Sequence, residues 1–273
     1  MRKIMTILSE YGYWGEELVE PLETLDREGY TTVFTTPQGK VPHAIPPSMD
    51  AHFIDPPLDR TVVSEEMARK VRELEASGRL ANPLNLSTVI PERPYLSSAN
   101  YLRKLEDYYQ ALEEGENRLA EYDALLLVGG SGPIVDMVNN QRVHDTILAF
   151  YKKNQPIAAE CYGVTCLVFA RDIQLRKSII WGKHVTGHAL ELDYKEGTGF
   201  LGTDFVMGPP PYPLEYILRD AVGPEGQYHG NVGKRTSVIV DYPFITARST
   251  ACSYLCGQKL VEVLQQGLRR FGW

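Results

Sequence analysis

Cys161 lies where an apolar strand is expected to turn directly into a buried helix. The strand covers Pro156 to Ala159, and the helix covers Gly163 to Ala170. A residue in this place is expected in a tight, exposed bend at a helix N-terminus, where the helix dipole favours negative charge. A lowered pKa would then leave part of the thiol as thiolate, the nucleophilic form. The alternative is a small cysteine of the hydrophobic core, and the local pattern leaves both interpretations open.

Glu17 is the carboxyl group that we expect to meet Cys161. It stands just inside the first predicted helix, which follows the first predicted strand. Because the carboxyl ends of parallel strands share one edge of a sheet, the two side chains can meet there although they lie far apart in the chain. Burial beside a thiolate would raise the pKa of this carboxyl, so that it could donate a proton or a hydrogen bond. The alternative is an ordinary acidic residue in the first turn of a helix.

A glycine-rich turn, Gly129–Gly132, follows the predicted strand Ala124–Val128. It lacks the lysine and hydroxyl residue of a phosphate-binding loop. We therefore expect the turn around Gly130 and Ser131 to bring backbone amides close to a substrate oxygen, with a plain strand-to-helix turn as the alternative. Aromatic side chains are candidates for lining a substrate pocket nearby: Tyr13, Trp14 and Tyr162.

His184 and His188 have the four-residue spacing of a metal-binding pair on a helix. The residues between them, Val185, Thr186 and Gly187, form helix poorly, so that the two rings need not share a face. We therefore expect no metal site and place His188 in the substrate pocket, with the metal pair as the alternative. The other cysteines are expected in the core: Cys166, Cys252 and Cys256.

The order of the predicted elements indicates a doubly wound α/β fold. A helix at Glu16–Glu28 lies between strands at Lys3–Leu8 and Tyr30–Thr35, which makes a βαβ unit. Residues 37–121 contain two helices and long proline-rich loops, more than two neighbouring strands need. We interpret residues 1–273 as one α/β domain with an inserted helical cap at about 37–121. The later elements are predicted at Ser178–Trp181, Ser237–Val240 and Phe244–Thr246 for strands, and at Leu214–Arg219 and Cys252–Phe271 for helices.

The composition narrows the classes of partner. The chain has 28 lysine and arginine residues against 35 acidic residues, a formal net charge of −7. Nucleic acids and anionic membranes bind basic surfaces, so neither is expected as a partner. No apolar run approaches the roughly 18–20 residues of a membrane helix, and the first residues predict a strand and not a signal peptide. Four cysteines in 273 residues do not suggest a disulfide framework, so a cytoplasmic location is expected.

Five short segments occur in a fixed order along the chain: Glu17 with Pro21, Thr35–Lys40, Val128–Pro133, Ala158–Gly163 and Gly182–Gly187. Together they resemble the ThiJ/PfpI superfamily, which has the class I glutamine-amidotransferase-like fold. The insertion after the second strand resembles its glutathione-independent glyoxalase and chaperone branch. The resemblance covers nearly the whole chain. It implies a flavodoxin-like sandwich with a mostly parallel central sheet, a nucleophile-elbow cysteine at Cys161, a partner acid at Glu17, a homodimer and no organic cofactor.

Two positions depart from the pattern of the glyoxalases. Members of that type carry His directly after the elbow cysteine, where this chain has Tyr162, and His in the glycine-rich turn, where it has Ser131. Both departures remove a general base. We expect His188 to replace that base and Tyr162 to act as a donor. The chain also lacks the late His and Glu pair of glutamine amidotransferases, so glutaminase activity is not expected.

These observations predict a cofactor-independent, cysteine-dependent enzyme that acts on the electrophilic carbon of a small or medium-sized carbonyl-type substrate. Cys161 would attack or hold that carbon, and backbone amides near Gly130 and Tyr162 would stabilise the oxyanion. Hydrolase, hydratase and lyase chemistry all fit, and glyoxalase-like dehydration is one of them. The loops Tyr11–Trp14 and Phe200–Tyr212 indicate a substrate larger and flatter than methylglyoxal. The alternative is a non-enzymatic stress protein, a redox sensor or holdase chaperone, in which Cys161 is oxidised.

Overall fold

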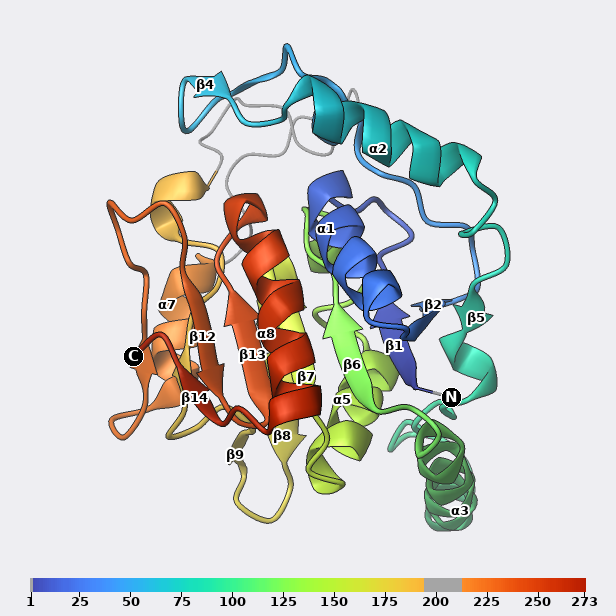
Figure 1. Ribbon diagram of the computed structural model, residues 1–273. Coiled ribbons are helices and arrows are strands. Elements are labelled where there is room, and N and C mark those ends of the chain that lie inside the picture. The colour runs from blue at the N-terminus through green and yellow to red at the C-terminus, as the bar shows by residue number, and fades with distance from the viewer. Residues whose placement is uncertain (1, 194–212) are drawn as a thin grey trace.

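A mostly parallel sheet of eight strands forms the centre of the computed structural model (Figure 1). The structure describes residues 2–193 and 213–273. The strand order is β14-β12-β13-β7-β6-β1-β2-β5, and the pairs from β13 to β5 are all parallel. The strands are β1 (Lys3–Ile7), β2 (Thr31–Thr36), β5 (Leu84–Asn85), β6 (Ala124–Leu127), β7 (Ile157–Glu160), β12 (Val238–Asp241), β13 (Phe244–Ala247) and β14 (Arg270–Phe271).

The central strands are apolar along their whole length because both faces of the sheet are covered. In β6, Leu125 and Leu127 join one hydrophobic cluster, whereas Ala124 and Leu126 join the other. The helices α1 (Gly15–Arg27) and α8 (Ser253–Gln266) cover one face, and α5 (Gln141–Lys152) and α7 (Leu214–Val222) lie on the opposite face (Figure 1). This arrangement confirms the predicted α/β fold with its mostly parallel central sheet.

Residues 37–121 contribute to more than one part of the fold. Their helix α2 (Glu65–Ala76) packs on α1 and lies beyond the carboxyl ends of the strands, together with the hairpin of β3 (Ile54–Asp55) and β4 (Arg60–Thr61) (Figure 1). Ser64 caps α2, as its sequence predicts, because its hydroxyl accepts the N–H of Met67 at 3.1 Å. Strand β5 extends the main sheet instead, and α3 (Tyr101–Leu119) lies towards the other end of the strands. The division into one domain and a cap stays a prediction.

The remaining elements are short. They are β3 (Ile54–Asp55), β4 (Arg60–Thr61), α4 (Pro133–Asp136), α6 (Thr165–Phe169), β8 (Arg171–Asp172), β9 (Lys177–Ser178), β10 (His184–Val185) and β11 (Gln227–Tyr228), with 3₁₀ turns at Pro46–Met49, Leu86–Thr88, Cys161–Val164, Leu190–Leu192 and Thr250–Cys252. None of the described helices combines the length and the apolar character that crossing a membrane requires.

Two predicted boundaries are wrong. The strand predicted at 178–181 ends at Ser178, because residues 179–182 form a turn whose apolar side chains are buried without pairing in a sheet. The last helix ends at Gln266 and not at Phe271. Gly267 takes a left-handed conformation with φ +69°, which stops the helix. The chain then returns to the sheet as β14, and Phe271 pairs there with Val240.

Gly15 provides a test of how α2 is held on α1. A Cβ atom added at Gly15 would lie 2.5 Å from both methyl groups of the buried Val71. We expect Gly15→Ala to lower the free energy of unfolding by about 1–3 kcal/mol through overpacking. In the double variant with Val71→Ala the methyl groups are gone, so the loss should be smaller than the sum of the two single losses. Denaturant unfolding of the four proteins measures this, and strictly additive losses would contradict the contact.

Candidate active site

Gly129 lies at the centre of the candidate site, between α1 and the end of β7. A Cβ atom added there would lie 2.4 Å from Oε2 of Glu17, 2.5 Å from the carbonyl oxygen of Glu160 and 2.7 Å from Cβ of Cys161. Only glycine therefore leaves enough space for these groups to come together. The structure thus brings Glu17 and Cys161 to one place at the carboxyl edge of the sheet.

Cys161 follows β7 directly and begins the 3₁₀ turn that leads into α6. Its φ of +50° lies in the left-handed region, which costs a non-glycine residue about 1 kcal/mol or more. The predicted tight bend is therefore present. The predicted exposure of the bend is wrong, because only 6% of Cys161 is accessible to solvent. The thiol is enclosed by Glu17, by the glycine-rich turn and by His188.

Burial raises the pKa of the Cys161 thiol well above its ordinary value, and the charge of ionised Glu17 raises it further. Two backbone N–H groups, those of Gly130 and Tyr162, face the sulfur and act in the opposite direction. The expected lowering of the pKa is therefore wrong. Loss of water around the sulfur outweighs the favourable amides, because a thiolate in this place would have little solvation. The thiol therefore carries its proton, and only removal of that proton by a base would give the nucleophilic thiolate.

Glu17 is almost completely buried, with 2% of its surface accessible. Burial raises the pKa of this carboxyl to about 8, against the opposing effects of a hydrogen bond with Cys161 and of the N–H of Gly130. At neutral pH the carboxyl is therefore protonated. Its Oε2 atom has no hydrogen-bond partner among the described residues. A protonated carboxyl beside the sulfur can donate a proton to a group that is bound there.

The imidazole of His188 is a basic side chain that contacts the thiol of Cys161 directly. Its Nδ1 atom lies 3.3 Å from Sγ of Cys161. Its Nε2 atom lies 3.0 Å from Oδ1 of Asp193, in a geometry that is not that of a hydrogen bond, and the contact becomes an ion pair only when the imidazole is protonated. Both side chains are buried. The three residues form a cysteine–histidine–aspartate series, the arrangement in which an acid orients a base that activates a nucleophile.

Tyr162 supports this series from the side. Its ring stacks on the imidazole of His188, with ring centroids 4.0 Å apart and planes inclined by 24°. Its hydroxyl donates to Oδ1 of Asp193 at 3.0 Å. The hydroxyl expected to act on the substrate is therefore engaged with Asp193. Asp193 was not predicted as a site residue, because a carboxyl shortly after a histidine has no distinctive spacing; the available signal was an acidic residue beside a candidate base.

The other predicted site residues separate into two groups. Gly130 takes φ +87°, and its N–H faces Cys161, while the backbone N–H of Trp14 donates to the carbonyl oxygen of Gly129 at 3.3 Å. Ser131 belongs to this turn and is buried, and Trp14 is buried as well. Tyr13 differs, because its hydroxyl donates to Oε1 of Glu75 on α2 at 2.5 Å and its ring is fully enclosed in the core. Tyr13 therefore anchors α2 and does not face the thiol.

His184 and His188 do not form a pair. Their segment is extended, and the ring of His184 contacts His229 whereas that of His188 contacts Cys161. Within residues 2–193 and 213–273, no group of three or more His, Cys, Asp or Glu side chains has an arrangement that could hold a metal ion. The predicted pocket loop Phe200–Tyr212 lies outside the described residues.

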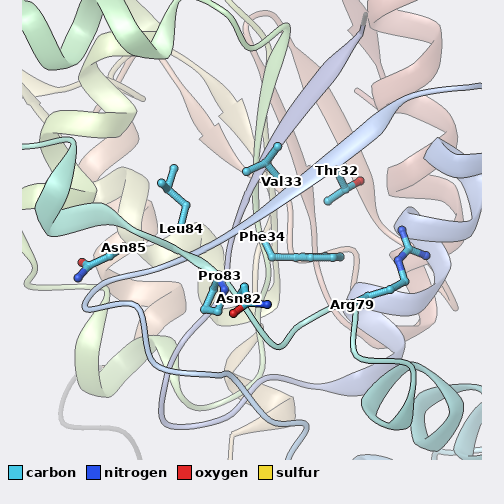
Figure 2. Close-up of a pocket in the computed structure, with 8 residues that line it drawn as sticks. All are labelled: Thr32, Val33, Phe34, Arg79, Asn82, Pro83, Leu84 and Asn85. Atoms are coloured by element: carbon cyan, nitrogen blue, oxygen red, sulfur yellow. The ribbon is translucent and has the colours of Figure 1, made fainter.

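A cavity of about 500 Å³ lies beside β2 (Figure 2). Its lining comes from β2, from β5 and from the segment between α2 and β5. The lining residues are Thr32, Val33, Phe34, Arg79, Asn82, Pro83, Leu84 and Asn85. None of the predicted site residues is among them, so the chemistry of Cys161 does not involve this cavity.

A cysteine at a strand-to-helix elbow with a buried carboxyl beside it, on a parallel α/β sheet, defines a recognised class of protein. A family model described as ThiJ/PfpI family-like matches residues 8–186. The chain therefore belongs to the ThiJ/PfpI-like family. Comparison with curated protein sequences gives no significant match.

Solved structures with the same fold cover nearly the whole chain. Rapid Encystment Protein 24 kDa from Francisella tularensis has 21% sequence identity and a TM-score of 0.67, covering 97% of this chain and 99% of that one. Glyoxalase III from Candida albicans has 14% identity and a TM-score of 0.59, with 95% and 96% covered. DJ-1beta from Drosophila melanogaster has 15% identity and a TM-score of 0.51, with 96% and 90% covered. At these identities the likeness shows the fold, and the predicted homodimer stays a prediction.

The raised pKa of Glu17 has a measurable effect on stability. The unfolded chain loses this proton near pH 4.5 and the folded chain only near 8, so the free energy of unfolding falls as pH rises between these values. Glu17→Gln removes the titration. We expect the variant to be more stable than the wild type at neutral pH, by up to about 3 kcal/mol, and to show a flatter pH dependence. Denaturant unfolding at about pH 5 and about pH 7 measures both effects.

The exposed Glu113 on α3 provides the control for this experiment. Glu113→Gln should leave the stability and its pH dependence unchanged, because an exposed carboxyl loses little solvation on folding. If Glu17→Gln kept the wild-type pH dependence, Glu17 would not be a protonated carboxyl in the folded state.

Proposed function

We propose that the chain is a cysteine-dependent enzyme that acts on the electrophilic carbon of a small carbonyl-type substrate. The observation that carries the proposal is the contact of 3.3 Å between Sγ of Cys161 and Nδ1 of His188, whose other ring nitrogen lies 3.0 Å from Asp193. Because burial keeps the thiol protonated, a base within reach of the sulfur is what the site needs for nucleophilic attack.

The first chemical step follows from this geometry. The thiol proton moves to Nδ1 of His188 as sulfur bonds to the carbonyl carbon. The electron pair of the C=O π bond moves to the oxygen. Asp193 stabilises the imidazolium that forms, and the hydroxyl of Tyr162 keeps the carboxylate of Asp193 in place.

The developing oxyanion would lie close to the sulfur, where two kinds of donor are available. The backbone N–H groups of Gly130 and Tyr162 already face the thiol. The carboxyl of Glu17, with a pKa of about 8, holds a proton at neutral pH that it can donate to the oxygen. After this step Glu17 is a carboxylate, because its proton is on the oxygen, and His188 is an imidazolium that holds the proton of the thiol. Breakdown of the adduct by water or by elimination distinguishes a hydrolase or hydratase from a lyase.

The substrate class follows from the size and polarity of the site. With Cys161 exposed by only 6% and Tyr13 directed to α2, the described residues favour a small electrophile over the large, flat substrate predicted from the aromatic loop. An aldehyde or 2-oxoaldehyde fits this description. The fold shared with a glyoxalase III supports testing such substrates first, although this chain has Tyr162 after the elbow cysteine and uses His188 in place of a histidine there.

Turnover of a panel of aldehydes, 2-oxoaldehydes and small amides tests the proposal. Cys161→Ala should abolish activity, and His188→Gln should lower kcat/KM by about 10²–10⁴-fold because the thiol loses its base. Asp193→Asn should have a smaller effect, since Asp193 contacts the base and not the substrate. Cys166→Ala, which changes a buried cysteine on the next helix, is the matched control and should keep turnover.

Two outcomes would contradict the proposed enzymatic activity. Full activity in Cys161→Ala would remove the nucleophile from the proposal. Absence of turnover across the panel, combined with selective and stoichiometric oxidation of Cys161 by mild peroxide in intact-mass measurements, would instead support the redox sensor.

A further inference from the structure

The side chains of His184 and His229 form a direct pair at the start of the segment that carries His188. Nδ1 of His184 lies 2.8 Å from Nε2 of His229, and the ring centroids lie 5.0 Å apart. A bond between two imidazoles requires one nitrogen to donate and the other to accept. It therefore exists while at least one of the two rings is neutral, and it is lost when both are protonated.

Trp273 covers the other face of His184. The two rings are nearly parallel, inclined by 10°, with centroids 3.4 Å apart. The indole N–H of Trp273 donates to the carbonyl oxygen of Val240 on β12 at 2.9 Å. Strand β14 precedes Trp273 and pairs with β12 at the edge of the sheet (Figure 1). His184 thus stacks on a tryptophan that is hydrogen-bonded to the main sheet.

A short, closely bonded segment connects this pair to the candidate base. The N–H of Thr186 donates to the hydroxyl of Thr246 on β13 at 2.9 Å, and its own hydroxyl donates to the carbonyl oxygen of His229 at 2.7 Å. The hydroxyl of Tyr228 donates to the carbonyl oxygen of Gly187 at 3.1 Å. His188 follows directly. The position of the segment, and of the His188 ring, therefore depends on the contact between β10 and the chain around His229.

Gly187 leaves this segment little freedom to move. A Cβ atom there would lie 2.8 Å from Cδ1 of Leu218 on α7 and 3.2 Å from the side chain of Val164 in the turn after Cys161. A displacement of the segment must therefore change the distance between His188 and the elbow, because tightly packed groups cannot absorb it locally.

The charges around the pair have both signs. The carboxylate of Asp241 on β12 accepts the backbone N–H of His184 at 2.9 Å, and its charge favours protonation of the His184 imidazole. Lys183 lies 3.3 Å from the same carboxylate. Arg270 on β14 and Lys234 in the loop after β11 oppose protonation of His184 and His229, respectively. Glu225 lies beside the turn at Gly182. Burial lowers the pKa of both imidazoles, so the pair is neutral at neutral pH.

We propose that His184 and His229 are positioning residues for His188, and that double protonation of the pair in weakly acidic solution weakens the contact of His188 with Cys161. The proposal rests on the proposed role of His188 as the base. The direction of this pH effect follows from the linkage between proton binding and the stability of the folded arrangement. A histidine held neutral in the fold stabilises the arrangement at a pH above its ordinary pKa, and this stabilisation is lost as pH falls.

Two readouts test the proposal between about pH 7 and about pH 5, the range in which histidine titrates. The first is hydrogen exchange of the Trp273 indole N–H, followed by NMR and assigned with Trp273→Phe. The protection of this N–H relative to a free indole at the same pH is expected to fall roughly threefold to tenfold at the lower pH, the size that loss of one hydrogen bond gives. The second is the rate of Cys161 alkylation by iodoacetamide, which reports the thiol without any substrate.

The variant His229→Gln separates the effect of the His184–His229 pair from that of His188, which it leaves unchanged. The glutamine amide can still bond to Nδ1 of His184 but does not titrate. Its indole protection should vary less with pH, and the acid loss of Cys161 alkylation should be smaller than in the wild type, because a glutamine amide oxygen still accepts from His184 when that ring is protonated. His229→Phe removes the bond and should show fast indole exchange already at neutral pH. His52→Gln, at an exposed histidine of residues 50–53, is the matched control and should behave as the wild type.

The outcomes separate this proposal from the proposed function. Indole protection, taken relative to a free indole at the same pH, that does not change with pH in the wild-type protein would overturn the proposal, and this measurement decides it even where a variant fails to fold. Identical pH profiles of Cys161 alkylation in the wild type and His229→Gln would overturn it as well. Repeating the indole measurement in Cys161→Ala keeps the test of the histidine pair independent of any catalytic role of the thiol.

Discussion

The absence of a side chain at Gly129 is the constraint on which the candidate site depends. Glu17, the end of β7 and Cys161 all approach the space that a Cβ atom would occupy, within 2.4–2.7 Å of its position. This packing excludes water from the thiol and from the carboxyl, and it thereby raises the pKa of both groups. The imidazole of His188 lies against the protonated thiol, within 3.3 Å of the sulfur. The site is therefore one unit, in which a backbone contact determines the protonation of the side chains.

The sequence was sufficient for the fold and for the proximity of Glu17 and Cys161. Runs of apolar residues such as Ala124–Leu127 and the helix cap at Ser64 specify local structure, and the parallel order of strands then brings Glu17 to Cys161. The protonation state could not be predicted in the same way. A helix N-terminus favours a thiolate, but the loss of solvation depends on how completely other segments enclose the sulfur, and that follows from packing between distant residues.

The series of Cys161, His188 and Asp193 shows a second limit of sequence patterns. The spacing of His184 and His188 is that of a helix, whereas the chain there is extended and sends the two rings to different partners. Tyr162 was singled out because it replaces an expected histidine. Its stacking on His188 and its hydrogen bond to Asp193 arise from the tertiary fold, and no local sequence rule connects these positions. The last helix was predicted too long because one glycine at position 267 redirects the chain into the sheet.

The burial of Cys161 also determines how this site would survive in the presence of peroxides. Peroxides react with the thiolate and only slowly with the protonated thiol, so the raised pKa of Cys161 slows its oxidation. A cysteine that senses oxidants has the opposite requirement, since it must be ionised and accessible at rest. The enclosure of the elbow therefore slows oxidation of Cys161, and the same enclosure limits the size of any molecule that can reach the sulfur.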